Sequence, residues 1–312
     1  MIPALVLTAG LATRLRPLSF IRAKAALPVA GEPLARRILR GLAAAGVTDA
    51  VLNLHHLPHT LTALIGDGSD AGVHVRYSWE VPVLGSAGGP RRALPLMGSS
   101  TFLVVNGDTL TDIDVAALVA DHRRSGALVT MATIPNDQPE KYGGLRVEGA
   151  GVMTGFVPRG SSDPSEHFIG VQVVEAEAFS SVPDHAVESV GTVYQALVAG
   201  RRGSIRTFHT SAEFFDIGTP DDYLRTSLLL ASREHGPLRG RGARVHPSAR
   251  IEESVLWDDV EVGEGAMLRQ CVVTDGVRVP ADTSWTGVTM RRPNGELAPG
   301  ERVIDGMAIC SL

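Results

Sequence analysis

Short apolar runs alternate with longer amphipathic stretches from Ile2 to about Arg233. Each short run is bounded by turn residues, which is typical of buried strands. These predicted strands lie at 4–7, 49–54, 73–78 and 101–108. The strand at 4–7 reads Ala-Leu-Val-Leu, and its lack of alternation favours a strand that is covered on both faces.

Amphipathic stretches between these strands predict helices. Leu34, Ile38 and Leu42 recur at helical spacing, so we expect a helix over 33–46 that Gly46 ends. A shorter helix and a turn are expected over 59–68. After the strand at 101–108, the next helix is expected to have Asp112 and Asp114 in its cap and first turn.

This order of elements predicts an α/β fold, a Rossmann-like doubly wound and mainly parallel sheet with helices on both faces. Ligands of such sheets bind beyond the carboxyl ends of the strands. Gly10 and Asp108 each follow a predicted strand directly. We therefore expect both residues at the same edge of the sheet, where a ligand would bind.

The pattern changes after residue 232. Residues 233–244 are rich in glycine and arginine without any period, which is typical of a linker. Beyond them, apolar residues recur about every six positions, as in Val245, Ile251 and Trp257. A hexad period predicts a short left-handed β-helix of about two coils, with irregular strands as the alternative. The predicted organisation is a catalytic domain over 1–232, a linker over 233–244, and a β-helix with its tail over 245–312.

Composition narrows the class of protein. The formal net charge of −5 argues against a nucleic-acid partner, because binding to a phosphate backbone needs a basic surface. Two cysteines, Cys271 and Cys310, are too few for a disulfide framework and favour a reducing compartment. The N-terminus does not resemble a signal peptide, and no apolar run is long enough to span a membrane. We expect a cytoplasmic protein with no membrane partner.

The turn after the first strand has a composition that suits phosphate. Thr8, Ala9 and Gly10 are small, so backbone N–H groups would be accessible there, and Arg14 and Arg16 follow. The stretch is neither a dinucleotide fingerprint nor a P-loop. Taken alone, it is equally compatible with an ordinary strand-to-helix turn carrying surface arginines.

Five motifs in one order resemble those of the sugar-1-phosphate nucleotidyltransferases, the NDP-sugar pyrophosphorylases. The matching stretches are LTAGLATRLRPLSFIRAKAALPVAGEPL at 7–34, VLGSAGG at 83–89, VNGDTLTD at 105–112, YGGLRV with FIGVQV at 142–147 and 168–173, and FFDIGTP at 214–220. The hexad tail also occurs in several branches of this family. Chain length, the loop at 83–89 and the tail look most like the bacterial mannose-1-phosphate guanylyltransferase branch.

The resemblance implies that a nucleoside triphosphate and a sugar 1-phosphate are joined with release of pyrophosphate, Mg²⁺ being the cofactor. Catalytic roles would fall to Arg14, Lys24 and Asp108, with Asp108 and Asp216 as the metal ligands. The implied nucleotide-binding residues are Thr8, Ala9, Gly10, Ala12, Thr13, Gly85, Ser86, Ala87 and Gly88. The implied sugar-phosphate residues are Gly143, Gly144, Arg159 and Gly170.

Three positions depart from the family pattern. Ala12 replaces the glycine before Thr-Arg, Ala23 replaces the proline before Lys24, and Arg159 stands near the place of the usual sugar-phosphate lysine. Because uridylyl- and thymidylyltransferases share every motif named here, an enzyme of that kind for glucose 1-phosphate or a related sugar is an alternative. The departures at Ala12 and around Arg159 leave open a catalytically silent, NDP-sugar-binding regulatory subunit. A weaker alternative is a scaffold that assembles through its β-helix.

Two further features bear on partners and metals. A short β-helix has open ends that must be covered, either by the catalytic domain or by a second subunit. Related enzymes often dimerise through such tails, so the resemblance implies a homo-oligomer, most simply a dimer, with the tail at or near its interface. His55, His56 and His59 cluster after a predicted strand, but we read Pro58 as interrupting any helix that would align them. A metal site is therefore not expected at the histidines.

Overall fold

The computed structural model describes residues 2–312, and these fall into two compact units. The first unit comprises residues up to Gly10, Arg36–Pro58 and Ile65–Phe215. The second comprises Leu11–Ala35, His59–Leu64 and Asp216–Leu312. The segment 11–35, which carries much of the N-terminal motif, thus clusters with the C-terminal part of the chain.

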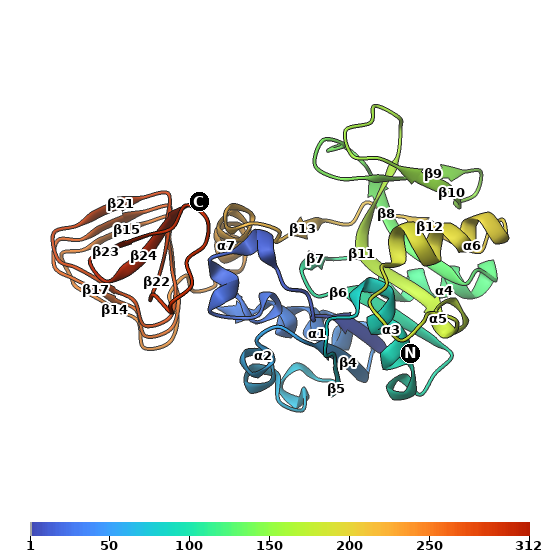
Figure 1. Ribbon diagram of the computed structural model, residues 1–312, viewed down its shortest axis with the longest axis horizontal. Coiled ribbons are helices and arrows are strands. Elements are labelled where there is room, and N and C mark those ends of the chain that lie inside the picture. The colour runs from blue at the N-terminus through green and yellow to red at the C-terminus, as the bar shows by residue number, and fades with distance from the viewer. Residues whose placement is uncertain (1) are drawn as a thin grey trace. The chain divides into compact units, whose positions relative to one another are not determined.

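A nine-stranded sheet in the order β5-β4-β1-β6-β11-β8-β12-β10-β9 forms the centre of the first unit (Figure 1). Its strands are β1 (Ala4–Leu7), β4 (Asp49–Leu54), β5 (His74–Trp79), β6 (Thr101–Asn106), β8 (Val129–Pro135), β9 (Gly144–Glu148), β10 (Val152–Val157), β11 (Glu166–Glu175) and β12 (Ile205–His209). The four strands predicted from the sequence are β1, β4, β5 and β6, and they pair in parallel. Beyond β6 the sheet is mixed, since β11 runs antiparallel to both of its neighbours.

The helices expected over 33–46, over 59–68 and after the strand at 101–108 are present as α1 (Leu34–Ala44), α2 (Pro58–Ile65) and α4 (Val115–Ser125). The helices α3 (Gly85–Met97), α5 (Glu177–Ser180) and α6 (Tyr194–Gly200), with a short irregular helix η5 (Ser189–Val193) before α6, were not predicted. Asp114 caps α4 as expected, because its side chain accepts a 2.9 Å hydrogen bond from the backbone N–H of Ala117. The expectation for Asp112 is wrong: it lies before the helix and instead accepts a bond from the backbone N–H of Glu213.

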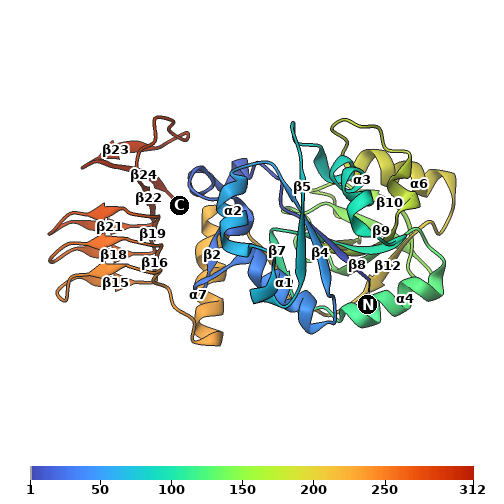
Figure 2. The same ribbon diagram turned by 90° about the horizontal axis from the view of Figure 1, so that it is seen from below.

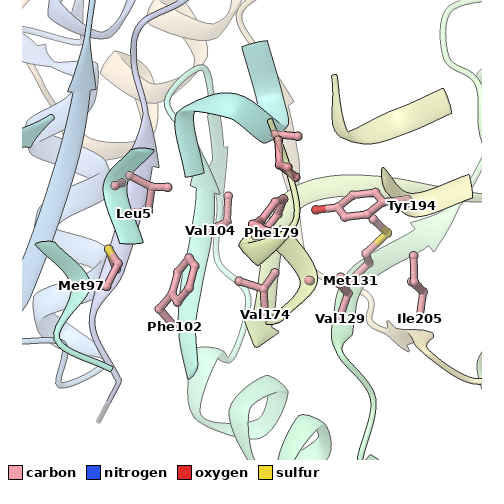
Figure 3. Close-up of a cluster of buried hydrophobic side chains, with 14 of the residues drawn as sticks. Leu5, Met97, Phe102, Val104, Val129, Met131, Val174, Phe179, Tyr194 and Ile205 are labelled. Carbon is pink, nitrogen blue, oxygen red and sulfur yellow. The ribbon is translucent and has the colours of Figure 1, made fainter. Parts of the chain in front are cut away.

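The core of the first unit lies between the sheet and these helices (Figure 3). Phe102, Phe179 and Tyr194 are almost completely buried there, and α3 packs against β1, β4 and β5. Burial raises the pKa of Tyr194 well above its ordinary value. Because this core fixes the strands, the loops that follow β1 and β6 are held at one edge of the sheet.

The β-helix in the second unit has three strands on each of its three faces (Figure 1). The faces are β14 (Arg244–Val245), β17 (Glu261–Val262) and β20 (Arg278–Val279); β15 (Arg250–Glu252), β18 (Met267–Arg269) and β21 (Ser284–Thr286); and β16 (Val255–Leu256), β19 (Val272–Val273) and β22 (Val288–Arg291). Figure 2 shows β15, β18 and β21 stacked in order. The prediction of a left-handed β-helix is confirmed, but three coils replace the expected two.

The coil repeats every 17 residues rather than 18. Val245, Val262 and Val279 therefore stand in register on one face, and Ile251, Leu268 and Trp285 on the next. The one-residue shortfall in each coil accounts for the slips that interrupt the hexad pattern in the sequence. A hairpin of β23 (Arg302–Ile304) and β24 (Met307–Ser311) extends the sheet of β22.

The remainder of the second unit is built on α7 (Pro220–Glu234) and the segment 11–35. The segment forms three single turns, η1 (Thr13–Leu15), η2 (Leu18–Phe20) and η3 (Lys24–Ala26), and a small sheet of β2 (Pro28–Val29) and β3 (Glu32–Pro33). Two short strands, β7 (Thr109–Thr111) and β13 (Phe214–Asp216), form a separate pair. Between residues 2 and 312, no helix combines the length and apolar character needed to cross a membrane.

Candidate active site

The two predicted phosphate and metal turns of the first unit are neighbours. Strands β1 and β6 pair in parallel with Leu7 opposite Asn106, so Thr8 and Asp108 emerge from the same edge of the sheet. The backbone N–H of Gly107 donates a 3.0 Å hydrogen bond to the carbonyl of Leu7. A Cβ at Gly107 would lie 2.4 Å from that carbonyl oxygen, so only glycine fits. The placement of Gly10 and Asp108 at one edge is thereby confirmed.

A buried amide holds the first turn. The backbone N–H groups of Thr8 and Ala9 both donate to Oδ1 of Asn53, over 2.6 and 3.3 Å, and the hydroxyl of Thr8 donates to the carbonyl of Asn53. Asn53 is the last residue but one of β4 and is only 3% exposed. With its own oxygen used in this way, Asn53 directs its amide N–H group toward Glu80.

Glu80 carries the connection to the glycine-rich loop. It accepts 2.8 Å hydrogen bonds from Nδ2 of Asn53 and from the backbone N–H of Leu84. Its exposure is 1%, and a Cβ at Gly89 would lie 2.7 Å from its carboxylate. One buried carboxylate thus joins the turn after β1 to the loop that begins α3.

The glycine-rich stretch 83–89, expected as a loop, instead forms the first turns of α3 from Gly85 onward. It packs against residues 185–189. The N–H groups of Ala87 and Gly88 donate to the carbonyl of Val187 over 2.8 and 3.2 Å. The hydroxyl of Ser86 donates to the exposed carboxylate of Glu188 over 2.6 Å. A Cβ at Gly88 would lie 2.8 Å from the carbonyl of His185, so close packing of the backbone already explains this glycine.

The predicted sugar-phosphate residues lie on two parts of the first unit. Gly170 in β11 has φ +82°, and a Cβ there would meet the hydroxyl of Thr109 at 2.5 Å, so it sits against the turn that carries Asp108. Gly144 in β9 lies against Ser165, whose hydroxyl would be 2.1 Å from an added Cβ. Gly143 is exposed beside the loop that carries the exposed Arg159.

An aromatic cluster adjoins these glycines. Tyr142 stacks on His167 with ring centroids 4.2 Å apart, and Phe214 meets His167 edge-on at 4.9 Å. Burial lowers the pKa of His167 below its ordinary value, which keeps the imidazole neutral near pH 7. This uncharged aromatic cluster was not predicted from the sequence.

In the second unit, the structure brings Arg14 and Asp216 together around Gly218. A Cβ at Gly218 would lie 3.2 Å from a carboxylate oxygen of Asp216, 3.3 Å from one of Asp222 and 3.5 Å from a guanidinium nitrogen of Arg14. The carboxylate of Asp222 already accepts hydrogen bonds from the hydroxyl of Thr219 and from Arg225. The absence of a side chain at this buried position leaves room for all three polar groups. An arginine and carboxylates facing one small space suit a ligand that carries phosphates and a cation.

Ala12 and Lys24 lie on the segment 11–35. Ala12 adopts the left-handed conformation with φ 49° and ψ 44°, and its carbonyl accepts a 3.0 Å bond from the hydroxyl of Ser19. This conformation accounts for the glycine that the family pattern has there. Lys24 begins η3, half-buried, directly after Ala23, whose N–H donates to the hydroxyl of Thr60 in α2.

The reason given for expecting no metal site at the histidines is wrong. Pro58 does not interrupt a helix but begins α2, as proline at the first helical position commonly does. His59 therefore lies within the helix, whereas His55 precedes it and contacts the carbonyl of Glu80 at 3.0 Å. No group of three or more histidine, cysteine or acidic side chains suited to a metal exists among residues 2–312.

Sequence reasoning missed Asn53, Glu80, Glu188 and Gly218. Asn53 lies inside β4 and Glu80 directly follows β5. Nothing in the neighbouring sequence distinguishes either of them from an ordinary polar residue. One signal was available: an asparagine inside the apolar run VLNL is unusual unless its amide is satisfied. Gly218 belongs to the matched FFDIGTP motif, which was recognised in the sequence. The need for a glycine beside Asp216 and Arg14 was not.

Two family models together match residues 3–291 of the chain. Residues 3–233 match the family described as nucleotidyl transferase, and residues 234–291 match a GlmU-like C-terminal hexapeptide family. A mannose-1-phosphate guanylyltransferase of Mycobacterium tuberculosis is 32% identical over 293 residues, covering 90% of this chain and 82% of the relative. A UTP–glucose-1-phosphate uridylyltransferase of Synechocystis is 26% identical over 298 residues, covering 88% of this chain and 76% of the relative.

A solved structure shows the same fold. The crystal structure of HddC from Yersinia pseudotuberculosis superposes with a TM-score of 0.65 at 22% identity, covering 74% of this chain and all of the other. This likeness shows the fold alone, whereas the family match and the M. tuberculosis relative confirm the predicted resemblance.

Proposed function

The chain belongs to the nucleotidyl transferase family, in its sugar-1-phosphate group, and we propose that its substrates are GTP and mannose 1-phosphate. The observation that carries this choice is the similarity to the mannose-1-phosphate guanylyltransferase of M. tuberculosis, which extends over 90% of the chain. The reaction forms GDP-mannose and releases pyrophosphate. Both reactants are anions, so the chain's task is to align them and neutralise their charge.

The proposed chemistry needs no general base, because the attacking sugar phosphate is already ionised. Its oxygen attacks the α-phosphorus of the triphosphate in line with the departing pyrophosphate. Arg14 would bind the triphosphate together with the backbone of Thr8 to Thr13. Lys24 would bridge the attacking and departing phosphates, and Arg159 would bind the phosphate of the sugar. Each of these side chains acts through charge, so each should affect all nucleotides alike.

Magnesium fits the donor set that the chain offers. Mg²⁺ is usually held by one or two carboxylates with substrate phosphates and waters completing its shell, so it requires no cluster of three protein ligands. We propose Asp108 and Asp216 as these carboxylates. In the structure, Asp108 follows β6 in a turn shaped by Gly107, and Asp216 faces the space at Gly218 beside Arg14. When bound, the ion would neutralise charge on the phosphates of the triphosphate.

The chemistry of the glycine-rich loop supports guanine as the base. Guanine presents two adjacent hydrogen-bond donors, N1–H and N2–H, whereas uracil and thymine present one donor between two acceptors. The exposed carboxylate of Glu188 lies against Gly85, 2.8 Å from the position of an added Cβ. A carboxylate accepts two parallel donors well, as it does from arginine. We propose that Glu188 reads the guanine edge.

The alternatives are a uridylyl- or thymidylyltransferase and a silent regulatory subunit. The uridylyltransferase of Synechocystis covers nearly as much of the chain at 26% identity, which keeps the first alternative in view. The presence of Arg14, Lys24, Asp108 and Asp216 argues for activity over a silent subunit. Ala12 and Arg159, which depart from the family pattern, are the residues that favour a silent one.

A substrate panel tests the proposal. Purified protein is given GTP, UTP, dTTP, ATP or CTP with mannose 1-phosphate or glucose 1-phosphate, and pyrophosphate release is measured. We expect GTP with mannose 1-phosphate to give the highest kcat/KM. A preference for UTP or dTTP would move the chain to the alternative branch, and no turnover with any pair would identify a regulatory subunit. Glu188→Gln should lower the ratio of kcat/KM for GTP to kcat/KM for UTP.

Assembly and location complete the proposal. We propose a homodimer with the β-helix tail at or near its interface and a cytoplasmic location, where nucleoside triphosphates are available. The exposed side chains of Val303 and Ile304 on β23, 54% and 40% exposed, support an interface there. Light scattering at micromolar concentration tests the oligomer, and a monomer would remove it. Val303→Glu should dissociate the dimer without changing the fold of the catalytic domain.

A further inference from the structure

The segment 11–35, which carries Arg14 and Lys24, is tied to the β-helix by charged contacts within the second unit. Arg22 donates from Nε to Asp275 over 2.8 Å and from Nη2 to the other oxygen of the same carboxylate over 2.6 Å. The same Nη2 donates to Asp258 over 2.9 Å. The Arg22 side chain is only 12% exposed, so water screens this contact weakly.

The two carboxylates occupy equivalent places in successive coils. Asp258 and Asp275 are separated by the 17-residue repeat, and the N–H of Asp258 donates to Asp275 over 3.1 Å. A two-oxygen contact with one carboxylate and a further bond to the next fixes both the position and the plane of the guanidinium. The stacking of the coils therefore sets where Arg22 stands.

An aromatic ring also contacts Arg22. The guanidinium of Arg22 lies 5.3 Å from the ring centre of Trp257, which is fully buried. Nε1 of Trp257 donates 2.8 Å to the hydroxyl of Tyr223, and that hydroxyl donates 2.5 Å to the carbonyl of Pro28. Residues on both sides of Lys24, at positions 22 and 28, are thus held by the β-helix or by α7.

A second contact reaches the segment at Phe20. The guanidinium of Arg291, at the end of β22, lies 4.9 Å from the centre of the Phe20 ring. Arg291 is itself fixed by a completely buried ion pair with Glu301, with nitrogen–oxygen distances of 2.7 Å. The segment is therefore attached to the β-helix at Phe20 and at Arg22, both of which precede Lys24, and to α7 at Pro28, which follows it.

We propose that Arg22 is a positioning residue for Lys24, and that the β-helix thereby belongs to the phosphate-binding apparatus rather than serving assembly alone. The inference rests on the proposed function, because it takes Lys24 as the group that contacts the phosphates. Arg22 contacts no substrate in this scheme. It acts by fixing the backbone two residues before Lys24, so that the ammonium group is held where both phosphates can reach it.

The test compares Arg22→Gln, Arg22→Lys and Asp275→Asn with the control Glu261→Gln. Glu261 pairs with Arg244 and Arg278 in the same 17-residue register, but on the exposed β14–β17–β20 face. Its loss removes β-helix ion pairs without touching the segment 11–35. Three quantities are measured for the full chain: kcat and KM for each substrate, hydrogen exchange of peptides covering 18–30, and the midpoint of thermal unfolding.

Arg22→Gln should lower kcat at least tenfold with a smaller change in KM, and should speed hydrogen exchange over 18–30 while the sheet of the first unit stays protected. Arg22→Lys retains the charge without the planar fork, so it should recover part of kcat. Asp275→Asn, which leaves Asp258 in place, should have an intermediate effect. Glu261→Gln should change neither kcat nor exchange over 18–30.

The inference would be overturned by unchanged exchange over 18–30 in Arg22→Gln, or by an equal loss of kcat in Glu261→Gln. Failure of the proposed function looks different. In that case the unaltered chain would turn over no substrate pair, yet the exchange measurement would still report whether Arg22 and the β-helix order the segment around Lys24. A loss of stability equal in all four variants, with no separate change in kcat, would show a purely structural role and would also overturn it.

Discussion

Asn53 donates a 2.8 Å hydrogen bond to Glu80, and both side chains are almost completely buried. This single contact joins the turn after β1 to the start of α3, because Asn53 also accepts from the backbone of Thr8 and Ala9, and Glu80 accepts from the backbone of Leu84. Two segments that lie far apart in the sequence are thus held together. Their relative position depends on two polar side chains that never face solvent.

Removing the amide should weaken both the fold and the nucleotide site. Asn53→Ala leaves the N–H groups of Thr8 and Ala9 without their acceptor and Glu80 without its donor. Each buried polar group left unsatisfied costs about 1–3 kcal/mol, so we expect a loss of roughly 2–5 kcal/mol in the free energy of unfolding. Urea denaturation measures that loss, and calorimetry with GTP measures affinity. Wild-type stability in Asn53→Ala would show that water replaces the amide.

The metal carboxylates should control turnover without controlling the fold. Asp108→Asn and Asp216→Asn each remove one negative ligand from a site whose task is charge cancellation, so each should lower kcat by orders of magnitude. Circular dichroism should be unchanged. Raising the Mg²⁺ concentration should recover part of the activity if the loss is in metal affinity. Near-wild-type activity for either variant at subsaturating Mg²⁺ would identify a wrong carboxylate.

The phosphate cations should act on every nucleotide alike. Arg14→Ala and Lys24→Ala should each cost roughly 2–4 kcal/mol of transition-state stabilisation, measured as the fall in kcat/KM. The ratio of GTP to UTP activity should stay constant, because a phosphate contact does not distinguish bases. Arg36→Ala, a change of the same chemistry on α1, serves as the control. A change in nucleotide preference in Lys24→Ala would reassign that lysine to base recognition.

Relieving the strain at Ala12 should stabilise the segment that carries the cations. An alanine in the left-handed conformation costs roughly 1–2 kcal/mol relative to a right-handed one, and glycine removes most of that cost. Glycine also gives the unfolded chain more freedom, which offsets about 0.4–1 kcal/mol. Ala12→Gly should therefore raise the free energy of unfolding by about 1 kcal/mol or less, which urea denaturation can detect.

A second alanine provides the matched control for this change. Ala30 also has φ 49°, but it is buried, with 4% of its surface exposed. Ala30→Gly relieves similar strain while losing a packed methyl group, so its net gain should be smaller. Equal gains in both variants would mean that the methyl groups do not matter, and a loss in Ala12→Gly would mean that its methyl makes a stabilising contact.

The elements with strong local periodicity could be predicted from the sequence. Leu34, Ile38 and Leu42 indicate α1, and the strand 49–54 has the predicted bounds. The edge shared by Gly10 and Asp108 also followed, since consecutive parallel strands end at one side of a sheet. These features depend on neighbours in the chain, which a linear pattern records.

What the sequence did not reveal depends on partners far along the chain. Arg22 and Asp275 are 253 residues apart, and neither position differs locally from a surface charge. The number of coils was underestimated because a 17-residue repeat does not keep a strict hexad phase. Likewise, the sequence does not predict the left-handed backbone at Ala12, because alanine usually avoids that conformation. The glycine that the family pattern has at this position was a clue.

The contact between Arg22 and the β-helix also predicts how stability depends on pH. Burial by itself raises the pKa of Asp258, but the backbone N–H of Arg241 and the guanidinium of Arg22 outweigh it and hold the pKa below the ordinary 3.8. The ionised carboxylate therefore stabilises the fold fully above the unfolded value of about 4. That contribution is lost as the pH falls through the lower pKa of the folded state.

Asp258→Asn should consequently be destabilised relative to the unaltered chain at pH 7, with the difference narrowing as the pH falls from 5 toward 3. Arg22→Gln removes the partner of Asp258 instead. Between pH 5 and pH 3, the free energy of unfolding of this variant should therefore fall less steeply than that of the unaltered chain. Urea denaturation at a series of pH values measures both curves. A difference between Asp258→Asn and the unaltered chain that stayed constant down to pH 3 would mean that Asp258 keeps its ordinary pKa, and that Arg22 is held by Asp275 alone.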